Sequence, residues 1–274
     1  MRTFWKHAAC LGVAAFGLSG CTPEQTPPAA RGVAASFVAG RAFDRAQSAI
    51  KRNNTSALER AGSDLRRAAS AGSNPRLVGA LATNLAFQAG FASDQARQLR
   101  GDQRNRLEED SNAKYRAALA FTPENQPEKS LDPPTLNALG YFLADKGSTR
   151  ADFERAAVLT RAAYLKWDVS GKSFDFNELN RATGPQDSYA WALFKLGRYE
   201  QARREAEKVW ELSRGMGQVN QTADIPFHLA EIYRALGQNS KARETYEAAL
   251  SLSPGEETRT SIERGLQSLD LARV

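Results

Sequence analysis

Apolar residues recur every three or four positions through most of the chain, and arginine, glutamate and glutamine fill many of the positions between them. This spacing is typical of amphipathic helices rather than strands. In the front half it predicts helices over about 33–53 and 54–72, a third from 75 to a break near Gly90, and a long polar helix over 93–121. Proline and glycine fall mostly between such segments, as expected of residues that interrupt helices. The pattern therefore predicts an all-α protein.

The most regular pattern lies near the C-terminus, where small and large apolar residues stand at fixed offsets: Leu229, Ala230, Tyr233, Gly237, Ala242, Tyr246, Ala249 and Pro254. The segment 223–256 resembles the tetratricopeptide repeat, a helix–turn–helix unit of about 34 residues. Such a unit buries its apolar face only against a neighbouring unit. The resemblance implies an antiparallel helix-pair solenoid, a tetratricopeptide-like superhelix. The amphipathic stretch 258–272 is predicted to be its C-terminal capping helix.

Two less regular units precede this one, with Gly140 and Ala190 as the small residues that let two helices approach closely. Gly197 and Gly237 are predicted to end their first helices in the left-handed conformation that glycine adopts most easily. Each of them is followed five residues later by an alanine. The corresponding step after Gly147 is nine residues, which predicts a turn about four residues longer.

The chain departs from a regular repeat in two further ways. The back half contains two insertions, at 168–184 and about 214–222, which lengthen the distance between unit starts. In the front half only the eight-residue step from tyrosine to proline over 115–123 matches the last unit, where it spans 246–254. The front half is therefore predicted to be a degenerate version of the repeat.

These observations predict four segments. Residues 1–20 form a signal peptide, 21–32 a flexible tether, 33–129 an atypical helical, degenerate repeat-like region, and 130–274 a repeat domain with its capping helix. A proline-rich polar stretch over 122–134 marks the junction between the two helical regions.

The N-terminus has the layout of a secretory signal, with Arg2 and Lys6 followed by the uncharged stretch 8–18. The run Leu-Ser-Gly-Cys that ends at Cys21 resembles the bacterial lipobox, in which the cysteine is acylated and becomes the mature N-terminus. Two or more acyl chains anchor a protein stably to a membrane. Thr22 after the cysteine resembles Gram-negative lipoproteins sent to the outer membrane. The resemblance implies a lipid anchor at Cys21 and a location at the periplasmic face of the outer membrane.

The charge of the chain is unevenly distributed. The formal net charge is +6, and residues 22–129 contain 16 Lys and Arg against 11 Asp and Glu, while residues 130–274 contain 19 against 20. A basic surface attracts anionic partners, so one alternative is an accessory protein that binds cell wall or lipopolysaccharide through the basic front half. Arg97, Arg100, Arg104 and Arg106 would carry that contact. The predicted envelope location makes nucleic acid a poor fit, and we expect no nucleic-acid partner.

In repeats of this family the first helices line a concave groove, and residues beside the apolar stripe face the ligand. The resemblance implies a groove that binds a protein or peptide. Tyr141 and Trp191 occupy equivalent positions directly after Gly140 and Ala190. Aromatic rings beside mixed charge suit an extended peptide or an amphipathic helix; packing of both rings against their neighbours is the competing interpretation. The predicted groove residues are Asn137, Tyr141, Asp187, Trp191, Lys195, Phe227, Glu231 and Arg234, and Asp145 lies on the same helix face as the first two.

The sequence contains few of the residue patterns that are typical of catalytic sites. Beyond the predicted leader the chain has one histidine, His228, which we expect on the face of a packed helix. It has no HExxH, GxSxG or CxxC motif, so the usual zinc sites and nucleophilic triads lack their parts. We therefore expect no enzyme activity, no cofactor and no metal. The sequence predicts a membrane-tethered scaffold that mediates protein–protein interaction in an envelope complex, of the pilus, secretion or outer-membrane assembly type.

Overall fold

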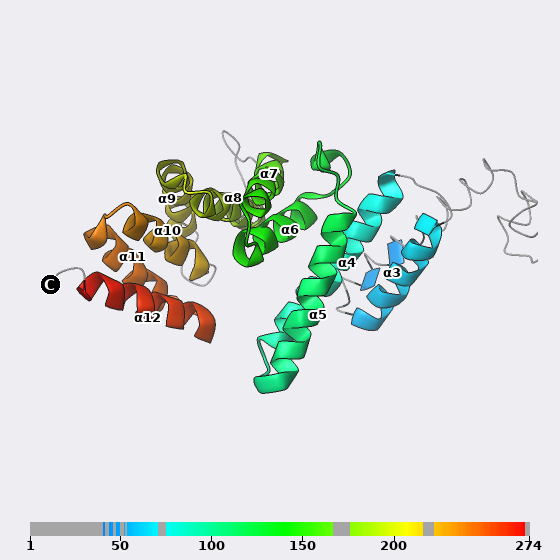
Figure 1. Cartoon of the computed structure of the whole chain (residues 1–274), viewed down its shortest axis with the longest axis horizontal. Helices are drawn as coiled ribbons and strands as arrows, with labels where there is room; N and C mark the ends of the chain where they lie inside the picture. Colours follow the sequence, from blue (N-terminus) through cyan, green and yellow to red (C-terminus); the bar gives the residue numbers. More distant parts are fainter. Residues whose placement is uncertain are drawn as a thin grey trace, which may run out of the picture. The chain divides into compact units, whose positions relative to one another are not determined.

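The structure is a computed structural model that describes residues 54–70, 75–166, 176–215 and 222–271, together with Arg41, Asp44, Arg45, Ser48, Ala49 and Arg52. The predicted signal peptide, the tether and Cys21 lie outside these residues. Throughout the described ranges the regular secondary structure is helical, with no strand, and within each of the two compact units described next, helices that follow one another in the chain pack as neighbours (Figure 1). The prediction of an all-α fold built from helix pairs is confirmed.

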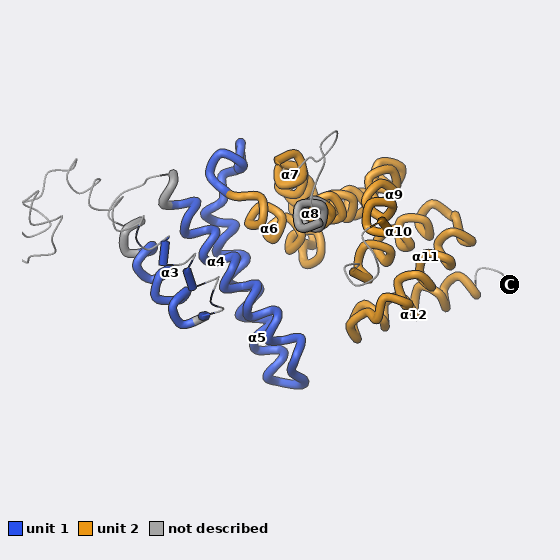
Figure 2. Tube along the Cα trace, turned by 180° about the vertical axis from the view of Figure 1, so that it is seen from behind, with its two compact units in different colours: residues 1–131 blue, residues 132–274 orange. Residues whose placement is uncertain are grey.

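The chain divides into two compact units, residues 1–131 and 132–274 (Figure 2). In the first unit α4 packs against both α3 and α5. Its core contains a buried polar bridge, because the side-chain amide of Asn84 donates to the carbonyl oxygen of Leu58 at 3.1 Å and accepts from Gln88 at 2.7 Å. The elements of this unit are α3 (Thr55–Ser70), α4 (Pro75–Ala96), α5 (Gly101–Ala120) and the short 3-10 helix η2 (Pro127–Lys129).

The helix boundary predicted near Gly90 is wrong. α4 continues through Gly90 to Ala96, and the break comes at residues 97–100, before α5. Arg100 has an extended backbone, with φ −134° and ψ 162°, and it is the residue from which α5 starts. An isolated glycine costs a helix about 1 kcal/mol relative to alanine, and the buried residues on either side of Gly90 offset that cost.

The second unit consists of successive antiparallel helix pairs and a final helix. Within each pair the two helices pack together, and each pair packs against the next. The last helix, α12, contacts both α10 and α11, which is the position expected for a cap. The helices are α6 (Pro133–Lys146), α7 (Arg150–Lys166), α8 (Phe176–Lys195), α9 (Tyr199–Gly215), α10 (Asp224–Ala235), α11 (Asn239–Ser251) and α12 (Glu256–Leu271).

Local sequence signals explain where several of these helices begin and end. Asp132 precedes α6, and its carboxylate accepts a hydrogen bond from the main-chain N–H of Thr135 at 2.9 Å. Gly197 and Gly237 have φ of +74° and +70°, so the prediction of left-handed glycines after α8 and α10 is confirmed. In both turns the residue after the glycine donates its N–H to the carbonyl five residues earlier, at 3.0 and 2.9 Å.

The turn between α6 and α7 is different, and the prediction that it is four residues longer is wrong. α7 begins at Arg150, three residues after Gly147, so most of the additional residues are helical. Asp152 stabilises this start, because its carboxylate accepts from the main-chain N–H groups of Ser148 and Thr149 at 3.1 and 3.0 Å.

The insertion predicted over 168–184 is also partly helical. α8 begins at Phe176 and continues through Pro185 to Lys195, so residues 176–184 extend the first helix of the pair. Pro185 removes one main-chain hydrogen bond from the helix interior, and it is buried. Residues 168–175 lie outside the described ranges.

Small residues mark the places where the helices of a pair approach each other. Ala190 and Ala230 have no exposed surface. At the equivalent Gly140 an added Cβ would lie 2.6 Å from Cγ2 of Thr160 on α7, closer than packed atoms allow. Tyr246 is also fully buried, at the place where α12 closes the stack. The predicted packing role of these repeat positions is confirmed by their burial.

We predict that Gly265→Ala destabilises the second unit by about 1–3 kcal/mol, as overpacking does. A Cβ at this position on α12 would lie 2.5 Å from the ring and hydroxyl of Tyr246, so the capping helix would have to move. Gly215→Ala is the matched control, because a Cβ there meets nothing within 4 Å. Urea denaturation followed by circular dichroism measures both variants, and equal effects would contradict this account of the cap.

Candidate functional site

The predicted groove residues come from the first helices of three successive pairs, α6, α8 and α10. α8 packs against both α6 and α10, and each first helix is backed by the second helix of its own pair. The positions are equivalent from pair to pair. Asn137, Asp187 and Phe227 precede the small contact residue by three positions, and Tyr141, Trp191 and Glu231 follow it by one.

The structure gathers several of these residues around His228, a residue that sequence analysis placed on a helix face without a role. His228 is 2% exposed, and its Nδ1 donates to Oδ2 of Asp187 at 2.9 Å. Its ring stacks on Trp191, with centroids 4.3 Å apart and planes 17° from parallel, and Tyr141 approaches it at 6.2 Å. We call these residues, Tyr141, Asp187, Trp191 and His228, the histidine cluster. It joins side chains of α6, α8 and α10.

Trp191 forms the aromatic centre of the cluster and is 7% exposed. Its ring also stacks on Phe194 at 4.8 Å and lies 6.3 Å from Phe227. The ammonium of Lys195 lies 4.9 Å from the centroid of the Trp191 ring, within range of a cation–π interaction. The indole is therefore packed, and the accessible surface beside it belongs to Tyr141, Lys195 and Phe227, which are half-buried.

Three polar atoms in this region are buried and have no hydrogen-bond partner among the described residues: Oδ1 of Asn137, Oδ1 of Asp187 and Nε1 of Trp191. Two of them are acceptors and one is a donor. A buried polar atom without a partner costs about 1–3 kcal/mol. The side chain of Asn137 lies beside Gly184, one helical turn before Asp187, since a Cβ at Gly184 would be 4.0 Å from its Nδ2. All three atoms thus belong to one strip across α6 and α8.

The remaining predicted residues, Glu231 and Arg234, are engaged with each other and with the core. The guanidinium of Arg234 lies 2.6 Å from Oε2 of Glu231, and the hydroxyl of Tyr246 donates to the other oxygen of the same carboxylate. Burial and the bond to Glu231 both raise the pKa of Tyr246 above its usual value. The polar groups of α10 at this end of the site are therefore satisfied within the fold.

The charge around His228 shifts its titration. Burial alone lowers the pKa of a histidine, but the attraction and hydrogen bond of Asp187, with help from Asp224 and Asp145, outweigh burial and raise it above the ordinary value. These three carboxylates come from α8, α10 and α6. Lys195 is a cation beside the stacked rings. The cluster thus stabilises the protonated imidazole relative to an imidazole in water.

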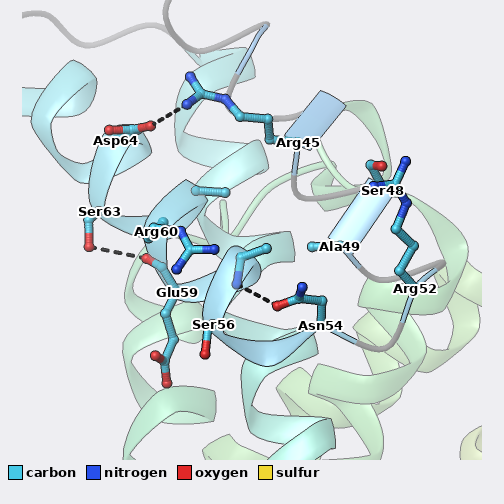
Figure 3. Close-up of a pocket in the computed structure, with 12 residues that line it drawn as sticks. Arg45, Ser48, Ala49, Arg52, Asn54, Ser56, Glu59, Arg60, Ser63 and Asp64 are labelled. Carbon is cyan, nitrogen blue, oxygen red and sulfur yellow. Dashed lines mark hydrogen bonds and ion pairs between the residues drawn. The ribbon is translucent and has the colours of Figure 1, made fainter.

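The first unit contains a separate open cavity of about 770 Å³ between the residues before α3 and the start of that helix (Figure 3). Several of its polar groups already have partners. Arg45 pairs with Asp64 at 3.1 Å, and the side-chain oxygen of Asn54 accepts from the N–H of Ala57 at 2.9 Å. Arg52 and Arg60 also line it.

Two of the four arginines on which the cell-wall alternative depends are paired inside the first unit. Arg97 lies 3.6 Å from Asp94, and Arg104 lies 2.6 Å from Glu108. The two residues of each pair are three or four positions apart in the sequence. The acidic partner therefore reduces the positive charge that the arginine presents to an external anion.

Neither a metal site nor a membrane span is found in the described ranges. No group of three or more His, Cys, Asp or Glu side chains there is arranged to hold a metal ion. No helix within those ranges is both long enough and apolar enough to cross a membrane.

These features define an all-α helix-pair repeat protein with a buried histidine cluster on its first helices. Residues 223–256 match the family model of the tetratricopeptide repeat, in agreement with the predicted unit. The comparison with curated proteins gave no match. Among solved structures the chain is similar to the TPR2AB domain of yeast Sti1 in its complex with pHSP90, with 13% identity, a TM-score of 0.29, and coverage of 86% of this chain and 99% of that one. This is a distant likeness.

We predict that His228 makes folding stability depend on pH. Its raised pKa means that the folded state binds the proton more tightly than the unfolded chain, whose histidine titrates near pH 6.5. The contribution of His228 is therefore fully present below that pH and is lost as pH rises through the folded pKa. Urea denaturation across this range, with His228→Gln as the comparison, measures the difference. A difference that grows as pH rises would contradict the assignment.

Proposed function

We propose that the protein is a non-catalytic scaffold that binds a protein segment on the first helices of its second unit. The single observation that carries this proposal is the strip of buried polar atoms without partners beside half-buried aromatic side chains. Tyr141, Lys195 and Phe227 present accessible surface, while Asn137 and Asp187 keep unused acceptors just beneath it. Burial of the aromatic surface would supply binding free energy, and hydrogen bonds to the unpaired polar atoms would fix the orientation of the bound segment. This combination is suited to a peptide or an amphipathic helix.

The helix-pair fold supports this role independently of the site. Stacked pairs create an extended continuous surface whose exposed residues vary while the packing residues stay fixed. The match of residues 223–256 to the tetratricopeptide repeat points the same way, because repeats of this family commonly serve protein–protein interaction. Trp191, which is packed, would act mainly by holding Tyr141, Phe227 and His228 in place.

We further propose that the scaffold is tethered by an acylated Cys21 to the periplasmic face of the bacterial outer membrane. It would serve there in an envelope complex of the pilus, secretion or outer-membrane assembly type. The support for this is the sequence alone: the signal-like leader, the Leu-Ser-Gly-Cys run and the proline-rich tether. The anchor would hold the repeat unit near partners in or beneath the membrane.

The groove assignment predicts a position-specific crosslink. A photoreactive benzoylphenylalanine in place of Tyr141 should capture a discrete partner in cells, and Phe227→Ala should reduce that capture at least about fivefold, because it removes an aromatic contact from the same surface. The matched control is the same photoreactive residue in place of Tyr199, which is 39% exposed and lies on a second helix. A crosslinking pattern that is the same from positions 141 and 199 would contradict the assignment.

The tether predicts a change of location. Cys21→Ser should move the protein from the membrane fraction to the soluble fraction and remove its labelling by radioactive palmitate, because the thiol is the only proposed attachment point. Ser19→Ala, a small-residue change next to the site, should keep both properties. Membrane association that survives Cys21→Ser would rule out the lipid anchor.

A further inference from the structure

The buried carboxylate of Asp187 uses only half of its hydrogen-bonding capacity. Its side chain is 8% exposed, and Oδ2 accepts from His228 at 2.9 Å. Its Oδ1 is buried and accepts from no described residue. A carboxylate oxygen has room for two donors and is costly to bury without any. Asp187 therefore holds a buried acceptor, without a partner among the described residues, within the histidine cluster.

Trp191 offers the complementary group on the same helix face. It follows Asp187 by four residues, so the two side chains lie one above the other on α8. Its Nε1 is a buried donor with no acceptor among the described residues. The pair thus presents one unused acceptor, which is anionic, and one unused donor. A peptide residue with a cationic side chain and a main-chain carbonyl carries both matching groups.

All three helices that form the site contribute carboxylates to its surroundings. Three carboxylates, one each from α6, α8 and α10, act on His228 and raise its pKa: Asp145, Asp187 and Asp224. Asp145 also pairs with Lys146 at 2.9 Å, and the guanidinium of Arg234 is bound to Glu231. The ring of Trp191 already attracts one cation of the chain itself, the ammonium of Lys195 at 4.9 Å. Because that side chain is long and stands at the last residue of α8, it can swing away without unfolding the helix.

We propose, building on the scaffold function above, that the site binds a partner segment bearing a lysine or arginine, and that this cation bonds to Oδ1 of Asp187 beside the Trp191 ring. In the free protein the ammonium of Lys195 contacts the Trp191 ring, and the incoming cation displaces it. Nε1 of Trp191 donates to a main-chain carbonyl of the same segment. His228 holds the carboxylate in position, so Asp187 is the group that determines specificity for basic over acidic partners.

The test measures binding of short fluorescein-labelled peptides to the full-length chain in detergent, by fluorescence anisotropy. One peptide alternates leucine with lysine, and a second alternates leucine with glutamate. We expect the lysine peptide to bind more tightly. Lys195→Met, which keeps most of the stem and removes the charge, should tighten its binding about threefold, since the ring no longer has an internal cation. Asp187→Asn should weaken it about tenfold or more.

Two matched controls separate this effect from general charge. Lys241→Met removes a lysine that lies 5.3 Å from the ring of Tyr233, a similar contact away from the histidine cluster. Asp270→Asn removes an exposed carboxylate of α12 that pairs with Arg243. Both variants should bind the lysine peptide as the parent chain does. If Asp187→Asn loses its helical circular dichroism, the Lys195→Met result decides the question alone.

Several outcomes would overturn the proposal. Tighter binding of the glutamate peptide, weakened by Lys195→Met, would show that the site takes an anionic segment, while the scaffold function would stand. An unchanged affinity for the lysine peptide in Lys195→Met, or its failure to bind, would also reject the cation site. If both peptides bind equally and Tyr141→Ala affects neither, the groove itself is wrong, and the scaffold function proposed for it fails as well.

Discussion

Everything in the second unit depends on how closely the two helices of each pair approach. Ala190 and Ala230 are fully buried at these contacts, and at the equivalent Gly140 there is no room even for a Cβ. A pair held this tightly has one packed interior and one apolar face that only another pair covers. The stack must therefore end in something polar on its outer side. α12 does this, and its Gly265 leaves the space that the ring of Tyr246 fills.

The same constraint produces the site. Because each first helix packs against the next, residues close to the small contact residue come together across neighbouring pairs. That geometry brings Asp187, three residues before Ala190, to His228, two residues before Ala230, although 41 residues separate them. Two apolar residues in their place would stabilise the stack at least as well, since a buried ion pair rarely repays its desolvation. A polar pair that leaves one carboxylate oxygen unused therefore fits the binding role proposed above.

The sequence predicted the features that a single repeat encodes. The left-handed Gly197 and Gly237, the small residues at helix contacts and the terminal cap all follow from local spacing, and the structure contains them. The prediction of helix boundaries failed where the spacing of apolar residues is the same on both sides of the boundary. The helical period continues across residues 97–100, so nothing in it marks the break between α4 and α5. Residues 176–184 likewise lack repeat residues yet continue α8.

The part of His228 in the cluster was missed for another reason: its contacts with Asp187 and Trp191 depend on the offset between neighbouring pairs, which no individual repeat contains. The available signal was a lone histidine directly before the packing residue Leu229, and it pointed to burial without naming the partner.

The charged side chains at the predicted groove positions of α10 are already paired within the fold. On α10 the carboxylate of Glu231 is bound by both Arg234 and Tyr246. On α6 and α8 the equivalent positions carry Tyr141 and Trp191, and buried polar atoms beside them have no partner within the described residues. The binding surface proposed above therefore has its unused hydrogen-bonding capacity on α6 and α8. The 223–256 repeat also contains two buried polar atoms without partners among the described residues, Oε1 of Gln238 and Nε of Arg243, but these belong to the turn and the second helix of that pair.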